Sequence, residues 1–157
     1  MAFDSLAQRR IMGHFATGVT VVTAYQDGEI CGMTANAVTS LSLNPPLVLV
    51  AVDKTAAMHD TLTASGCFAL NMLTREQEHL SRRFAMRGPK EVKDLTWIKA
   101  VSGSPILADS LAWVDCRLTE ILPGGDHSIF LGEILAGDAR DGSPLLYFGG
   151  KYRRLAE

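Results

Sequence analysis

Short runs of β-branched and apolar residues, separated by tight turns, recur along most of the chain. Residues 17–25 and 29–37 flank a turn at residues 26–28, which predicts a β-hairpin. Residues 47–52 contain no polar side chain and predict a strand buried on both faces. Further strands are expected at residues 67–73, 111–122 and 128–136, with a last strand or strand-like tail at residues 144–152.

Three segments carry helical signals. Residues 4–15 can place several apolar side chains on one face, with Asp4 or Ser5 as the N-cap. Residues 56–64 predict a short helix that stops at Gly66, and residues 74–84 one that opens with a Thr-x-x-Gln capping box. The glycine- and proline-rich residues 86–104 predict a mobile loop held by Trp97.

This pattern predicts a mainly β fold. Six or so strands with only two or three peripheral helices favour a six-stranded, closed antiparallel barrel. A doubly wound sheet would need regular alternation of strands and helices, and no Gly-x-Gly-x-x-Gly segment links a strand to a helix. If a nicotinamide nucleotide binds, it therefore does so without a Rossmann domain. The 157 residues, taken as 1–157, make one domain.

Composition and charge indicate which classes of binding partner and which cellular location to expect. A net charge of −2, with scattered lysines and arginines, gives no reason to expect nucleic acid or an anionic membrane surface. The apolar runs are about strand length, far short of the ~20 residues that a membrane-spanning helix needs. The opening residues lack the features of a secretory signal, and three widely spaced cysteines suggest buried thiols, so we expect a cytoplasmic protein. The histidines lack ligand spacing, so no metal site is expected.

Residues 32–54 form the most informative segment. Short and hydroxyl-bearing side chains lead into a Pro-Pro turn, an apolar strand and then Asp53-Lys54. Short side chains let a flat ligand approach the main chain, where N–H groups and hydroxyls can hold an anion. On the residues alone, a hydroxyl-rich strand end and a surface lysine are the favoured explanation, because surface lysines are common.

Six segments in order and register resemble the short-chain flavin reductase family, the reductase components of two-component flavin-dependent monooxygenases. They are residues 17–23, 32–54, 67–73, 83–85, 125–127 and 144–148. The resemblance implies the flavin-binding split barrel, usually a homodimer, and NAD(P)H-dependent reduction of FMN or FAD for a partner oxygenase. Which flavin and which nicotinamide nucleotide are used stays open.

The resemblance also implies a site. The flavin ring edge would contact Thr34, Ala35, Asn36 and Ala37; Thr39, Ser40 and Lys54 would hold its phosphate, with Asp53 and Thr55 beside them. The family often has small hydroxyl residues just after the lysine, where this chain has Ala56 and Ala57. Backbone N–H groups at the start of a helix would then have to serve.

Three further residues have both a functional and a structural explanation. Phe84 matches the aromatic residue beside the flavin, or is a core residue at the end of a helix. Arg83 contacts a cofactor phosphate, or is solvated. His127, in Gly125-Asp126-His127, is the candidate catalytic residue that would stack on or hydrogen-bond to the nicotinamide, or is an exposed turn histidine.

Two other functions remain open. A tightly bound flavin could pass electrons to another acceptor, such as a cobalt corrinoid or a ferric chelate. Alternatively, the chain could be a non-catalytic flavin- or haem-binding module. Hydride transfer from nicotinamide to flavin N5 needs no acid–base pair from the protein, so the lack of such a motif is consistent with a flavin reductase.

Overall fold

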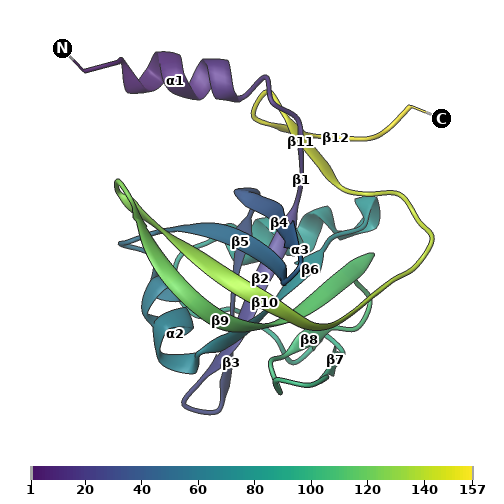
Figure 1. Cartoon of the computed structure of the whole chain (residues 1–157). Coiled ribbons are helices and arrows are strands. Elements are labelled where there is room, and N and C mark those ends of the chain that lie inside the picture. Colours follow the sequence, from purple (N-terminus) through teal and green to yellow (C-terminus); the bar gives the residue numbers. More distant parts are fainter. Residues whose placement is uncertain (1, 157) are drawn as a thin grey trace.

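The structure is a computed structural model that describes residues 2–156 (Figure 1). Its helices are α1 (Ser5–Met12), α2 (Ala57–Ser65) and α3 (Glu78–Ala85), the last preceded by a 3₁₀ turn, η1 (Arg75–Gln77). Its strands are β1 (Thr17–Gly18), β2 (Thr20–Gln26), β3 (Glu29–Ala35), β4 (Val38–Leu43), β5 (Pro46–Asp53), β6 (Cys67–Met72), β7 (Trp97–Ile98), β8 (Ile106–Leu107), β9 (Ala112–Gly124), β10 (His127–Ala139), β11 (Leu146–Phe148) and β12 (Lys151–Arg153).

One antiparallel sheet organises the chain, with strand order β3-β2-β6-β9-β10-β5-β4. Two small sheets, β1-β11-β12 and β7-β8, lie at its margins (Figure 1). The prediction of a mainly β fold with peripheral helices is confirmed. The closed six-stranded barrel is not, because the main sheet of residues 2–156 has seven strands and its end strands β3 and β4 are not paired with each other.

Several elements of the structure differ in detail from the predicted ones. β4 was not predicted as a strand, and it pairs with β5. β5 is not buried evenly on both faces: Val48, Val50 and Val52 are buried, whereas the residues between them are half-buried. The predicted loop at residues 86–104 contains β7, which pairs with β8, and the predicted strand at 144–152 is the β11–β12 hairpin.

Two apolar clusters lie on opposite faces of the main sheet. β2 contributes to both, because its side chains alternate: Val22 and Ala24 belong to the first cluster and Val21 to the second. α2 covers the first cluster with Met58 and Leu62. α3 covers the second with Leu80 and Phe84, together with residues of β8 and the tail. The two helices therefore hold the sheet from both sides.

The helix α1 has no buried residue. Its N-cap Asp4 accepts hydrogen bonds from the N–H groups of Leu6 and Ala7, as the sequence predicts. In Figure 1 it stands apart from the sheet, near the β11–β12 hairpin. Among residues 2–156, none of the helices is long and apolar enough to span a membrane.

The cysteines at positions 31, 67 and 116 are free thiols. Cys116 is fully buried in the first apolar cluster. Burial raises the pKa of its thiol to about 12, so the reactive thiolate form is strongly disfavoured at neutral pH. Cys116 is therefore a packing residue.

Candidate active site

The end of β5 and the start of β10 bring two predicted site segments together. His127 is paired with Asp53 across the two strands, and the N–H of Lys54 donates to the carbonyl oxygen of Asp126 at 3.0 Å. Asp53, Lys54, Thr55, Asp126 and His127 thus form one group, called here the lysine–histidine cluster. A candidate phosphate ligand and the candidate nicotinamide ligand therefore lie side by side.

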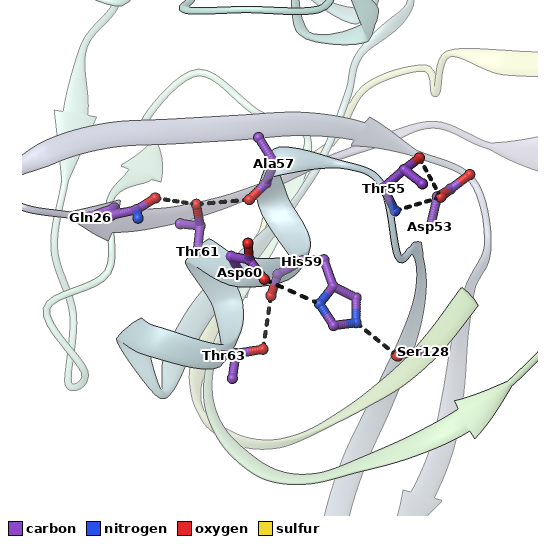
Figure 2. A network of polar contacts seen from close by, with 9 residues as sticks. All are labelled: Gln26, Asp53, Thr55, Ala57, His59, Asp60, Thr61, Thr63 and Ser128. Carbon is purple, nitrogen blue, oxygen red and sulfur yellow. Dashed lines mark hydrogen bonds and ion pairs between the residues drawn. The ribbon is translucent and has the colours of Figure 1, made fainter. Parts of the chain in front are cut away.

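Asp53 shapes the turn that presents Lys54. Its Oδ1 accepts hydrogen bonds from the N–H and the hydroxyl of Thr55, both at 2.8 Å (Figure 2). These bonds hold the pKa of the Asp53 carboxyl below its ordinary value, and the charge of Arg87, with that of His127 whenever its ring is protonated, adds to the effect. Asp53 is therefore an ionised turn-former rather than a proton donor.

His127 is partly exposed and oriented by its neighbour. Its Nδ1 lies 2.7 Å from Oδ1 of Asp126, so the carboxylate favours a hydrogen on Nδ1. Within residues 2–156, Nε2 has no hydrogen-bond partner, and the side chain is 38% exposed. The ring can therefore meet a ligand through Nε2 or through its face.

The predicted ring-edge segment lies beside the end of β5. The N–H of Ala51 donates to the carbonyl oxygen of Ala37 at 3.0 Å, which places this segment two residues before Asp53. Thr34 and Ala35 are engaged in the fold: the Thr34 hydroxyl donates to the Ser81 carbonyl at 2.6 Å, and Ala35 is buried. The exposed members are Asn36, Ala37, Thr39 and Ser40.

Arg83 and Phe84 are placed differently from this group. Arg83 donates to both carboxylate oxygens of Asp94, at 2.8 and 2.9 Å. This ion pair lowers the pKa of Asp94. Phe84 is 1% exposed in the second apolar cluster, where its ring lies directly over Gly32. The described contacts of both residues are structural, and their roles toward a flavin remain predictions.

Three residues that sequence reasoning missed adjoin the cluster. His59 of α2 contacts Ser128 of β10, with 2.8 Å between Nε2 and Oγ (Figure 2). Arg87, just after α3, acts on Asp53 through its charge. Strand alternation gave one available signal, because Ser128 must point away from the face that presents His127. The partner of Ser128, 69 residues earlier, had no signal.

Two hollows in residues 2–156, of about 460 and 630 Å³, lie away from the candidate site. The first is lined by residues 74–77, 109 and 140–143, and the second by residues 78, 82, 85–86, 147 and 150–152. Neither is lined by the lysine–histidine cluster or by residues 34–40. Lys54, the hydroxyls of β4 and the N–H groups at the start of α2 can hold a phosphate, because Ala56 provides no side-chain cap for that helix.

Comparison with known proteins gives a consistent picture. The family model described as "Flavin reductase like domain" matches residues 12–156. The chain is 43% identical to an NADH-dependent FAD reductase from Streptomyces globisporus, over 98% of this chain and 87% of that protein. It is 38% identical to the flavin-dependent monooxygenase reductase subunit HsaB from Rhodococcus jostii, over 96% of this chain and 78% of the other.

A solved structure extends the comparison. The Streptomyces globisporus NADH:FAD oxidoreductase SgcE6, determined with NAD and FAD fragments, matches with a TM-score of 0.92 and 42% identity. The match covers 98% of this chain and 93% of that one. The fold described above is therefore shared over nearly the whole length of both chains.

Proposed function

The chain belongs to the flavin reductase-like domain family, and on that premise we propose that it is an NADH-dependent flavin reductase that supplies reduced FMN or FAD to a partner monooxygenase. The observation that supports the proposal is the lysine–histidine cluster, in which Lys54, proposed for the flavin phosphate, and His127, proposed for the nicotinamide, come from adjacent strand ends. Bound flavin supplies the hydride-accepting chemistry. The residues have to bind and orient the two nucleotides.

The surface of residues 36–40 and 53–55 would hold the flavin. Lys54 and the hydroxyls of Thr39 and Ser40 are exposed and suit a phosphate. Asp53 and Thr55 fix the turn under Lys54 through their two hydrogen bonds. His127 would contact the nicotinamide, with Asp126 holding its ring through Nδ1. The protein thus binds and orients the two nucleotides, and the proposed reaction requires no residue to donate or accept a proton.

The experiment that tests this function is anaerobic mixing of purified protein and NADH with FMN, and separately with FAD. We expect flavin bleaching over many turnovers of added free flavin, and the faster flavin identifies the preferred one. Bleaching of a single bound equivalent would instead favour the enzyme with another acceptor, which steady-state rates with cobalamin and with ferric chelates would test. Protein that binds no flavin and oxidises no NADH would refute the proposal.

We also propose that the protein works as a cytoplasmic homodimer and that its curved sheet is the family's split barrel. In residues 4–15, called here the α1 segment, four apolar side chains are exposed in the single chain: Leu6, Ile11, Met12 and Phe15. Leu43, at the end of edge strand β4, is 91% exposed. Covering such side chains stabilises by about 1.5–3 kcal/mol each. A second copy would also help to enclose the exposed residues Asn36, Ala37, Thr39, Ser40 and Lys54, where the flavin is proposed to bind.

The α1 segment offers a direct test of dimerisation. Leu6→Asp should weaken the dimer by at least about tenfold, because it places a charge where an apolar contact is proposed. Gln8→Asp is the matched control, since it adds the same charge to the same helix at an exposed polar position. Light scattering coupled to size exclusion, over a dilution series, measures both. A monomeric wild-type protein at micromolar concentration, or equal effects of both variants, would contradict the proposal.

A further inference from the structure

His59 makes two contacts with the start of β10. Its Nε2 lies 2.8 Å from Ser128 Oγ, and its ring meets the ring of Phe130 edge to face, with centroids 5.1 Å apart. Ser128 and Phe130 are two positions apart on one strand, so their side chains share a face. Ser128 and Phe130 are buried, and the His59 side chain is 20% exposed. His59 therefore holds one face of β10 against α2.

The first turn of α2 is also joined to the end of β5. The N–H of Ala56 donates to the Asp53 carbonyl at 3.0 Å, and the N–H of His59 donates to the Ala56 carbonyl at 3.0 Å. Figure 2 shows Asp53 and Thr55 before the start of α2, and the imidazole of His59 pointing from α2 toward Ser128. Two main-chain hydrogen bonds, through Ala56, thus connect His59 to the segment that carries Lys54.

Ser128 follows His127 directly, and the two side chains point to opposite faces of β10. The contact of His59 with Ser128, on the face of β10 opposite to His127, therefore also restrains the backbone from which His127 projects. The strand pairing His127 with Asp53 begins at this same position, at the end of the ladder, where strands have the least support. A side-chain contact from α2 is therefore well placed to prevent fraying there.

We propose that His59 is a positioning residue for the reductase reaction. Through Ser128 it sets the position of His127 relative to Lys54, and so the position of the nicotinamide relative to the flavin. This inference rests on the proposed function. It assigns His59 no contact with either nucleotide. Because His59 acts through His127, replacing it should weaken NADH binding and leave flavin binding nearly unchanged.

Four variants test the assignment: His59→Leu, His59→Gln, Ser128→Ala and the double variant His59→Leu/Ser128→Ala. Leucine keeps apolar contact with Phe130 and loses the bond to Ser128. We expect His59→Leu and Ser128→Ala each to raise the KM for NADH by about 3- to 10-fold, as for one lost hydrogen bond, with flavin Kd changed less than about twofold. The double variant should be no worse than either single one. His59→Gln, whose amide nitrogen can replace Nε2, should recover most of the loss.

His79→Leu is the matched control, since His79 is an exposed histidine of α3. A second readout does not need turnover: the imidazole NMR signals of His127, identified by their loss in His127→Ala, should shift in His59→Leu and stay in place in His79→Leu. Additive effects in the double variant, equal losses toward flavin and NADH, or unmoved His127 signals would overturn the assignment. A wild-type protein without NADH oxidation would refute the proposed function instead, and the NMR comparison would still decide the role of His59.

Discussion

Replacing Gly132 by alanine should lower the free energy of unfolding by about 2–3 kcal/mol, near the upper end for overpacked cores. Gly132 lies in the middle of β10, where the first apolar cluster meets the sheet. A Cβ atom there would lie 2.6 Å from Cζ of Phe68 and 2.9 Å from Cβ of Cys116. Both neighbours are fully buried, so neither ring nor backbone can move away without disturbing the packing around it.

Chemical denaturation with urea measures this change, and Gly18→Ala is the control. Gly18 also lies in a strand, but nothing is within 4 Å of a Cβ built on it. We expect its alanine variant to stay within about 0.5 kcal/mol of wild type or to be slightly more stable, because alanine restricts the unfolded chain. Equal midpoints for the two variants would show that the β10 packing is looser than described.

Local signals predicted the elements that depend on local chemistry. The Thr74 capping box forms, with the N–H of Thr74 donating to Gln77 Oε1 at 2.9 Å. Gly66 ends α2 with a φ of 68°, a left-handed conformation that glycine adopts without strain. The β2–β3 hairpin forms around Asp27 and Gly28, both with positive φ. Each of these features needs only residues a few positions apart.

Features that depend on distant pairing were not predictable in the same way. β4 has the hydroxyl residues Thr39, Ser40 and Ser42, which suggested an anion-binding segment, and its pairing with β5 makes it a strand. Whether a sheet closes into a barrel depends on its two end strands, and here β3 and β4 are not paired. The helix α1 was correctly expected from its period, but the period alone did not show that its apolar residues would stay exposed.

In the candidate site, likewise, the sequence indicated single residues, and the tertiary fold determines how they are arranged. The resemblance pointed to Lys54 and His127 separately, and only the register of β5 with β10 places them together. Phe84 had two explanations from sequence; its place over Gly32 depends on how α3 packs on β3. His59 was passed over because helical histidines without ligand spacing suggest no metal. Its contact with Ser128 is a product of the tertiary fold.

Removing the imidazole of His127 should separate the two binding events of the reaction. His127→Ala should lower kcat/KM for NADH by about 10- to 100-fold, as expected when a hydrogen bond and a ring contact to the nicotinamide are lost together. Flavin affinity should change less than about twofold, because the flavin phosphate is assigned to Lys54, Thr39 and Ser40. Stopped-flow NADH oxidation and flavin fluorescence titration measure the two quantities.

Lys54→Ala is the reciprocal variant. It should raise the flavin Kd by about tenfold, the value of one charge-assisted contact, while the reduction rate at saturating flavin stays close to wild type. Opposite patterns in the two variants follow only if the lysine–histidine cluster divides its work between the two nucleotides. A His127→Ala protein that binds flavin and oxidises NADH at the wild-type rate would instead assign His127 to the turn alone. Equal losses toward both ligands in both variants would mean that the cluster acts as one structural unit, because removing either side chain would then disturb the whole turn.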